Sequence, residues 1–438
     1  MSAFHRPRFR TRLIRSPQFS RRQFLKGSAA FAALPLLDAC GDSSVLRAPA
    51  QAVPPPPAAP NPSPAPTPAP ITIAPKMAAF LHGVASGDPL PDRVILWTRP
   101  TLDAETVTAI ASAKGAVKLD YLMSKFTSLG NPVKTGIAFT NGDRDYTVKI
   151  DPTGLESYTT YFYQFSITLD DGMVIKSPIG RTKTAPKVGD TQRLRFAGVS
   201  CQNYTFGFFN PYRALMIKPD IDAILFLGDY IYEANGTPIV PGRDHIPAKE
   251  IVTLEDYRLR YGQYRTDEDL QAAHRQFPFI CIWDDHETAN NSWVGGSDRH
   301  DPEDGEWAVR KGVAVRAFFE WIPVRDNPST AFDSVDGQGY LPEGNGSIIR
   351  TFHYGELVDL IMLDTRLAGR DMPTDTVTVT EAHTILGKPQ REWFLNQLSS
   401  STAQWKIIGQ QVLFAPFKVV PLPEEQGGTY FAEDSWDG

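Results

Sequence analysis

The sequence predicts two folded domains in series, an immunoglobulin-like β-sandwich followed by a layered α/β domain. Residues 77–186 contain short runs of alternating apolar and polar residues separated by turn residues, a period of two that is typical of a β-sandwich. From residue 190 to residue 438, buried strands alternate with helices, which indicates an α/β sheet. A chain of 438 residues is long enough for both domains.

Residues 1–47 have the pattern of an export signal. Residues 20–26, with Arg21 and Arg22, match the twin-arginine motif, and the apolar stretch 29–37 is too short to span a bilayer. The sequence therefore predicts the twin-arginine translocation machinery as a partner and a periplasmic or cell-surface location. Residues 37–40 resemble a lipobox, so membrane anchoring through a lipidated Cys40 and ordinary cleavage near residues 48–50 are both open.

Residues 48–76 are so rich in proline and alanine that we expect an extended spacer. The net charge is -6, and no basic block interleaved with aromatic residues follows the signal, which argues against a nucleic-acid partner. The two other cysteines, Cys201 and Cys281, are far apart in the sequence and imply no disulfide framework. Nothing in the pattern specifies an oligomeric state.

The elements expected in the first domain are strands at 93–98, 116–121, 145–150 and 160–165. This part contains no cluster of ligand-type residues, so a packing or substrate-presenting role is expected. In the second domain, Asn210 and Pro211 open a helix as cap and first residue. Further strands are expected at 194–200, 223–227, 279–283, 347–352, 357–363 and 405–413, and helices at 254–264, 306–321 and 389–398.

Two of these buried strands end in acidic motifs. Strand 223–227 is followed by Gly228 and Asp229, and strand 279–283 is followed by the run Asp-Asp-His-Glu at 284–287. Open α/β sheets bind ligands at the carboxyl edge, so adjacent strands would direct Asp229 and Asp285 at one point. Two carboxylates in one pocket repel each other unless a cation lies between them. We therefore predict a metal ion.

Tyr232 and Cys201 are two further candidate ligands. Tyr232 follows Asp229 by three residues, and a phenolate is a hard oxygen donor that suits iron(III); simple packing of this tyrosine on the sheet is the alternative. Cys201 ends the preceding strand, where its thiolate could bind the same ion. A lone cysteine is otherwise a small buried hydrophobe, and that interpretation stays open.

His286 and Asn290 are candidates for catalysis. His286 could act as a general acid for a leaving oxygen or donate to phosphoryl oxygens, unless the motif is only a solvated surface turn. Asn290 and Asn291 follow about one turn later and could supply an amide ligand or a hydrogen-bond donor.

Several motifs in one order resemble the PhoD-like family of alkaline phosphatases. Residues 80–89 and 96–99 resemble the start of its N-terminal β-sandwich, and its catalytic motifs resemble residues 200–202, 227–233, 283–287 and 363–366. The resemblance implies a metallophosphoesterase domain that uses iron and calcium. Its reaction would be hydrolysis of phosphate mono- or diesters at alkaline pH by metal-activated hydroxide.

The same resemblance assigns roles to individual residues. Cys201, Asp229 and Tyr232 match the positions that hold the iron, and Asp229 is also placed to bridge to a second metal. The arrangement of Asp229 and Tyr232 is similar to that of purple acid phosphatases. Asp285 stands where related metallophosphatases carry a bridging asparagine, and Arg366 is a candidate phosphate contact. The family continues beyond the motif at 436–438 to an Asp and a His that complete its metal site. The resemblance therefore implies a chain that is incomplete at its C-terminus.

The sequence leaves two other functions open. The protein could be an inactive fragment or a non-catalytic exported protein that binds phosphoesters, and the content of bound iron would separate this from an enzyme. It could also be a different metal-dependent esterase on the same scaffold, which assays of phosphate release against carboxyl-ester cleavage would detect. Neither the physiological substrate nor a preference for mono- or diesters follows from the sequence.

Overall fold

The computed structural model describes residues 70–218, 220–326, 347–373 and 384–413. All of them belong to one of the two compact units into which the chain divides. The export signal with Cys40, the predicted spacer up to residue 69 and residues 414–438 lie outside the described residues. Within the described part of the chain, no helix has the length and apolar character needed to cross a membrane.

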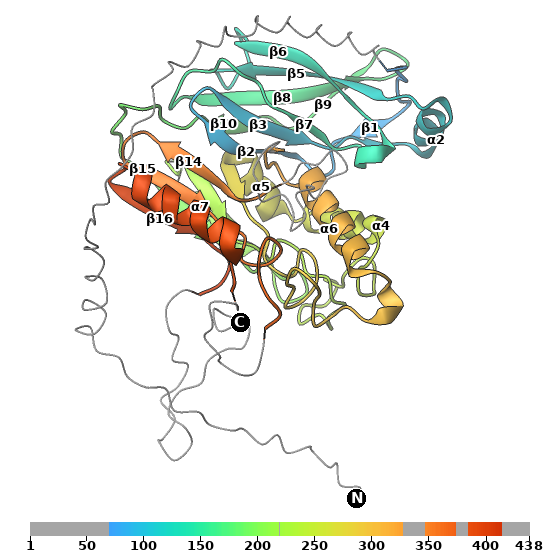
Figure 1. The fold of residues 1–438 in the computed structure, drawn as a ribbon. Coiled ribbons are helices and arrows are strands. Elements are labelled where there is room, and N and C mark those ends of the chain that lie inside the picture. The colour runs from blue at the N-terminus through green and yellow to red at the C-terminus, as the bar shows by residue number, and fades with distance from the viewer. Residues whose placement is uncertain (1–69, 219, 327–346, 374–383, 414–438) are drawn as a thin grey trace, which may run out of the picture. The chain divides into compact units, whose positions relative to one another are not determined.

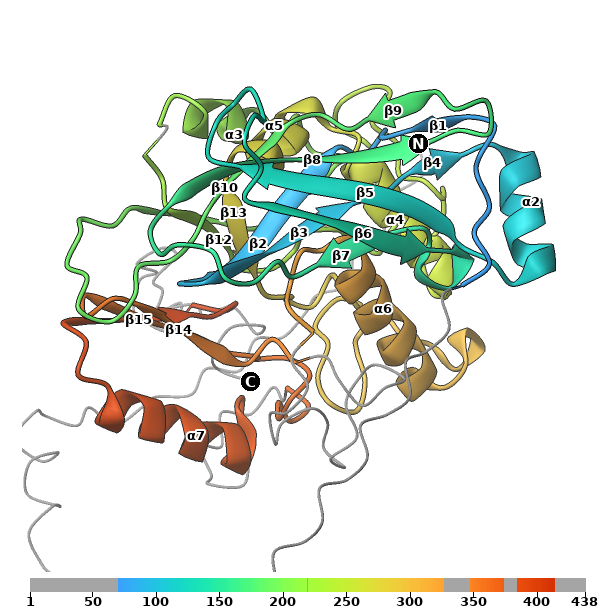
Figure 2. The ribbon, with the colours of Figure 1, turned by 90° about the horizontal axis from the view of Figure 1, so that it is seen from above.

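The N-terminal part contains a five-stranded antiparallel sheet. Its order is β10-β8-β5-β6, with β9 paired to β8. The strands are β5 (Val117–Ser124), β6 (Lys134–Thr140), β8 (Thr160–Thr168), β9 (Val174–Lys176) and β10 (Gly180–Lys183). Alternate residues of β8, among them Tyr161, Tyr163 and Phe165, are buried in the core beneath this sheet. Figure 2 shows the sheet lying over β2 and β3.

The second layer of this sandwich is part of a six-stranded sheet that runs through both halves of the chain. The order is β11-β12-β13-β2-β3-β7. The strands are β2 (Val84–Leu90), β3 (Arg93–Thr98), β7 (Val148–Ile150), β11 (Phe196–Val199), β12 (Ala223–Phe226) and β13 (Pro278–Cys281). Strands β11, β12, β13 and β2 are parallel neighbours, whereas β3 and β7 are added antiparallel. The β-sandwich therefore shares a layer with the α/β part.

Gly87 permits the join between β2 and β13, where it lies opposite Phe279. A Cβ atom at this position would lie closest to the carbonyl oxygen of Pro323 and 2.7 Å from that of Phe279, closer than side chains approach backbone. The absent side chain thus lets the two strands pair. Strand β2 was not expected from the sequence, because Gly87, Asp88 and Pro89 all belong to residue types that strands disfavour.

The α/β part adds helices and a second, smaller sheet of order β14-β15-β16. Its elements are α3 (Asn210–Leu215), α4 (Leu254–Tyr264), α5 (Glu268–Gln276), α6 (Trp307–Trp321), β14 (Arg350–Tyr354), β15 (Val358–Met362), α7 (Gly387–Ser400) and β16 (Trp405–Gly409). The small sheet packs on the large one, for example where the rings of Phe196 and Tyr354 meet edge to face at 4.9 Å between centroids. Helix α7 covers the small sheet (Figure 1) and contacts it through Gln397 and Thr351.

Most of the expected elements are present in the described residues. Strand β3 and helix α4 have the predicted bounds, and the other predicted strands and helices differ by a few residues at their ends. Helices α2 (Ala104–Ala113) and α5 and strand β6 were not expected. Helix α5 buries Leu270, Ala273 and His274 on one face, but most of its residues are polar or charged, so no apolar run marks it in the sequence. The short strands β1 (Ala78–Ala79) and β4 (Thr101–Leu102) pair with each other.

Residues 71–73, which precede the predicted domain start at residue 77, form an isolated bridge with the β-sandwich. Ile73 donates its backbone N–H to the carbonyl of Ala116 at 3.0 Å, and Ala116 donates back to Ile71 at 2.8 Å. The last residues of the expected spacer are therefore hydrogen-bonded to the β-sandwich.

A buried ion pair ties β2 to β14. Asp88 is fully buried, and its carboxylate accepts from Nη2 of Arg350 at 2.8 Å and from the backbone N–H of Arg325 at 2.8 Å. The Asp88→Ala substitution would leave the Arg350 guanidinium buried without its counter-charge. We expect a loss of about 3–5 kcal/mol in the free energy of unfolding, measured by urea denaturation.

The matched control for that prediction is the exposed pair of Asp92 and Arg93, whose closest atoms are 3.1 Å apart. The Asp92→Ala substitution should cost about 0–1 kcal/mol, because exposed pairs are solvated and screened. Equal losses from both substitutions would show that the buried pair does not hold the two sheets together.

Candidate metal centre

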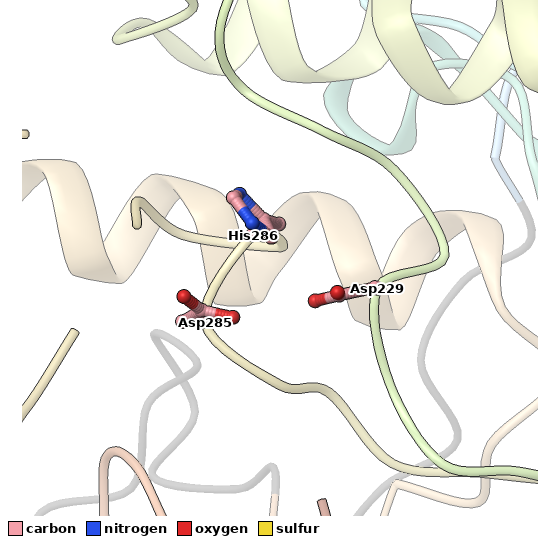
Figure 3. A group of neighbouring side chains, drawn as sticks. All are labelled: Asp229, Asp285 and His286. Carbon is pink, nitrogen blue, oxygen red and sulfur yellow. The ribbon is translucent and has the colours of Figure 1, made fainter. Parts of the chain in front are cut away.

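Three loops meet at the carboxyl edge of the large sheet. Cys201 follows β11, Asp229 follows β12, and Asp285 and His286 follow β13. One potential ligand atom from each of Asp229, Asp285 and His286 lies within 4.8 Å of the others. Figure 3 shows the three side chains directed toward one another from two neighbouring loops. The strand order therefore brings the two predicted acidic motifs together.

The turn at Gly228 and Asp229 has an unusual backbone. Gly228 has φ 108°, and Asp229 has φ 61°, in the left-handed region that is uncommon for a residue with a side chain. Cys201 also has a positive φ, 58°. The two loops are joined because the backbone N–H of Cys201 donates to the carbonyl of Gly228 at 3.1 Å. Backbone strain of this kind is common at functional sites, where surrounding contacts hold it in place.

The carboxyl group of Asp229 lies at the centre of the cluster. It is 6 % exposed, and burial together with the neighbouring charge of Asp285 raises its pKa to about 6. Its Oδ2 atom accepts from the phenol of Tyr232 at 2.8 Å. Its Oδ1 atom is buried and accepts no hydrogen bond from the described residues. A buried carboxylate oxygen without a partner is costly, which indicates a site for a cation.

Tyr232 and Cys201 both lie beside this carboxyl group. The phenol ring of Tyr232 stacks on the His286 ring, with 4.2 Å between centroids, whereas Tyr230 is buried in the core. Packing on the sheet therefore describes Tyr230 but not Tyr232. Burial raises the pKa of the Cys201 thiol to about 11, and the charge of Asp229 adds to the shift. The residue is nevertheless exposed, so it is not a buried small hydrophobe.

His286 is held by a carboxylate that sequence analysis did not single out. Its Nδ1 atom lies 2.6 Å from Oε2 of the fully buried Glu233. Burial alone would lower the pKa of His286, but the hydrogen bond to Glu233 and the charge of Asp285 raise it to about 10. The other Glu233 oxygen accepts from the backbone N–H of Asn290 at 2.9 Å, and this places Asn290 on the same loop. The motif at 284–287 is therefore not a solvated surface turn.

Arg366 reaches the cluster from the loop after β15. Its guanidinium is buried and bonds to Oδ1 of Asp284 at 2.5 Å, and it lies 3.6 Å from Oδ1 of Asp285. Burial raises the pKa of Asp284 to about 8 against the opposing effect of Arg366. The pKa of Asp285 is lowered, because the charges of Arg366 and His286 outweigh its burial. The structure thus directs Arg366 at the two aspartates.

Glu287 fixes the two acidic loops to each other. Its buried carboxylate accepts from the backbone N–H groups of Asp229 at 3.1 Å, of Asp284 at 2.8 Å and of Tyr230. Sequence analysis assigned no role to Glu287 or Glu233. The signal for both was present, because each is an acidic residue at the end of a motif that follows a buried strand.

The residues of this cluster fit a metal ion. Two carboxylates face each other with an imidazole beside them, and a phenol and a thiol lie at the same point. The unpartnered Oδ1 of Asp229 supplies a coordination position that no described protein group uses. This set of mainly oxygen donors is typical of sites for hard cations.

Three models of known families match parts of this chain. A family model described as PhoD-like phosphatase matches residues 196–438, and one for the N-terminal domain of PhoD-like phosphatases matches residues 65–186. A model of the twin-arginine translocation signal sequence matches residues 18–37. These matches confirm the predicted fold class, a β domain followed by a metallophosphoesterase-like α/β domain, and the predicted export by the twin-arginine pathway.

Two relatives cover most of this chain. Alkaline phosphatase D of Bacillus subtilis (strain 168) is 33% identical over 386 residues, which are 84% of this chain and 61% of that protein. The solved structure of PhoD has a TM-score of 0.67 and 34% sequence identity, over 82% of this chain and 66% of that one. The chain therefore spans about three fifths of the length of the curated relative.

The close approach of the two acidic loops gives a testable prediction at Gly228. A Cβ atom there would lie 2.6 Å from the backbone nitrogen of Asp284, at a φ that side chains rarely adopt. The Gly228→Ala substitution should therefore push the loops apart and lower the free energy of unfolding by about 1–3 kcal/mol. The amount of metal retained per chain after dialysis should fall as well.

Gly198 of β11 is the matched control, because a Cβ atom there would meet no atom within 4 Å. The Gly198→Ala protein should keep its metal. Full metal retention by the Gly228→Ala protein would mean that the separation of the loops does not define the site.

Proposed function

The chain belongs to the PhoD-like phosphatase family, and we propose that its metal centre hydrolyses phosphate mono- or diesters at alkaline pH. One observation carries this proposal. Asp229 and Asp285 place carboxylate oxygens within 4.8 Å of each other and of a ring nitrogen of His286, beside a buried Asp229 oxygen that has no partner among the described residues. A cation site at the open edge of an α/β sheet is suited to bind the phosphoryl oxygens of a substrate.

We assign iron(III) and calcium to this centre as part of the proposal. Cys201, Asp229 and Tyr232 would hold the iron, since thiolate and phenolate donors suit a trivalent transition metal better than calcium. Asp285, together with Asp229, would hold the second ion. When bound, these ions supply positive charge for the phosphoryl oxygens and lower the pKa of water so that hydroxide is available at the site.

The protein's own groups would orient the reaction. The Nδ1 atom of His286 is engaged by Glu233 at 2.6 Å, which leaves Nε2 as the nitrogen that can give a proton to the leaving oxygen. Asn290 is fixed on the same loop through its backbone N–H and could donate its amide to a phosphoryl oxygen. Arg366 would act on substrate mainly through Asp284 and Asp285, which its guanidinium contacts.

Two other functions can be distinguished from the proposed one by a single set of assays. A non-catalytic protein would bind phosphoesters without turnover, and a metal-dependent carboxyl esterase would cleave acetyl esters but release no phosphate. The experiment that separates them measures iron and calcium per chain together with hydrolysis of p-nitrophenyl phosphate, bis(p-nitrophenyl) phosphate and p-nitrophenyl acetate at alkaline pH. Turnover of the acetate alone, or of none of the three, would contradict the proposal.

The role of His286 can be tested by the His286→Gln substitution. Loss of the general acid should lower kcat for phosphoester hydrolysis by about 10²–10⁴-fold. The metal content of the variant is measured in parallel, so that loss of a proton donor is distinguished from loss of metal. The exposed His353, which pairs with Asp359 on the small sheet, is the control, and His353→Gln should keep full activity. A fully active His286→Gln enzyme would remove His286 from the mechanism.

Tyrosinate bound to iron(III) would give the protein a visible absorption band. The Tyr232→Phe substitution should abolish that band, because the phenol beside Asp229 is removed. Tyr230 is the control, since its phenol bonds instead to Nε2 of His274 at 2.8 Å, and Tyr230→Phe should stay coloured. A colourless but active and iron-free wild-type protein would refute the assignment of iron to Tyr232.

A further inference from the structure

A second pocket borders the metal centre on the side of Cys201 and Tyr232. Its volume is about 350 Å³, and its lining runs from these two residues to the aromatic side chains of Phe206, Phe208 and Tyr212. Phe206 and Phe208 are each 59% exposed, although they are large apolar residues. None of the residues that line the pocket carries a charged side chain. The pocket is thus uncharged and mainly apolar, with a few polar side chains such as Asn203, and it opens beside the candidate metal ligands.

The loop that carries these rings is held firmly at its base. Gln202 is buried, donates to the carbonyl of Tyr230 at 2.9 Å and accepts from the phenol of Tyr212 at 2.5 Å. The backbone N–H of Tyr204 donates to the phenol of Tyr264 at 3.1 Å. The loop that bears Phe206 and Phe208 is therefore hydrogen-bonded to the core and to the loop that follows Asp229.

Arg243 packs against the aromatic wall of the pocket, which includes Phe208 and Phe209. Its guanidinium lies 3.7 Å from the ring centroid of Tyr204, 4.9 Å from that of Phe208 and 5.1 Å from that of Phe209. The side chain is 6% exposed and also pairs with Asp267 at 3.2 Å. Stacking of a planar guanidinium on several rings favours one orientation of the wall. Phe208 is therefore held in place while one side of its ring stays open to solvent.

We propose that this aromatic pocket is the subsite for the leaving group, and that it receives an alcohol bearing an aromatic ring. The inference rests on the proposed hydrolysis, which places the phosphoryl group at the metal centre beside Cys201 and Tyr232. A pocket of about 350 Å³ is near the lower end of the range of about 300–1,000 Å³ for small-molecule sites, so it suits one ring system. Its uncharged aromatic walls favour a flat apolar group over a polyol such as glycerol.

The experiment compares an aryl with a polyol leaving group in a Phe206→Ala, Phe208→Ala double variant. We expect kcat/KM for bis(p-nitrophenyl) phosphate to fall by about tenfold, mainly through KM, because ring stacking is lost. The value for bis(glycerol) phosphate should change by less than about twofold, since glycerol gains little from stacking. Each variant is compared with wild type on the same substrate, so the different reactivities of the two esters cancel.

A binding measurement makes the test independent of turnover. Phenylphosphonate and methylphosphonate share one head group and differ in the ring, and their Kd values are measured by calorimetry. Wild type should bind phenylphosphonate more tightly than methylphosphonate. In the double variant the Kd of phenylphosphonate should rise about tenfold, and the Kd of methylphosphonate should not change. Arg243→Lys keeps the charge opposite Asp267 but removes the flat stack, and should shift the Kd of phenylphosphonate in the same direction by a smaller factor.

Phe126→Ala is the control, because this phenylalanine is 55% exposed in the N-terminal part, between β5 and β6, and should leave all values unchanged. Equal effects of the double variant on both phosphonates, or no preference of wild type for the phenyl compound, would overturn the subsite. A changed molecular mass in solution without changed discrimination would also overturn it, since the rings would then serve contact between copies. Failure of wild type to hydrolyse either diester would instead count against the proposed function.

Discussion

The candidate metal centre depends on one buried carboxylate, that of Glu287. It accepts three backbone N–H groups from the two acidic loops and so fixes the separation of Asp229 and Asp285. Burial raises the pKa of Glu287 well above its ordinary value, and the charge of Asp229 adds to this shift. The N–H groups oppose the shift, because only the ionised form accepts on both oxygens. Without Glu287, three buried donors would lose their partner at the point where the loops must be rigid.

Glu233 also joins the two acidic loops, but it starts from the other loop. It belongs to the loop of Asp229, yet it holds His286 and the backbone of Asn290 on the loop of Asp285. Each acidic motif therefore contributes one carboxylate that stabilises the other motif. Loss of either carboxylate would therefore leave polar groups on the opposite loop without their partner. This mutual support explains how a left-handed Asp229 can persist in a site that must keep its geometry.

The sequence was sufficient to predict the parts of the site that follow from local pattern. A buried strand ending in Gly228 and Asp229, and a second ending in Asp284 and Asp285, predict convergence once the strands are neighbours in a parallel sheet. The sequence places Glu233 and Glu287 in the two acidic motifs, but it could not predict their partners, which lie mostly on the backbone of the other loop. The same holds for β2, whose pairing with β13 depends on the close approach at Gly87 and not on strand propensity.

The N-terminal β-sandwich consequently does more than precede the α/β part. Strand β13 leads into the loop of Asp285 and His286, and it is hydrogen-bonded to β12 on one side and to β2 on the other. The pairing with β12 aligns the two acidic loops, whereas the pairing with β2 covers an edge that would otherwise be open. Strand β2 also contributes to the core of the sandwich. The two halves are therefore joined by one strand that belongs to the large sheet and to the sandwich core. The position of β13, and with it half of the metal centre, is therefore set jointly by both halves of the chain.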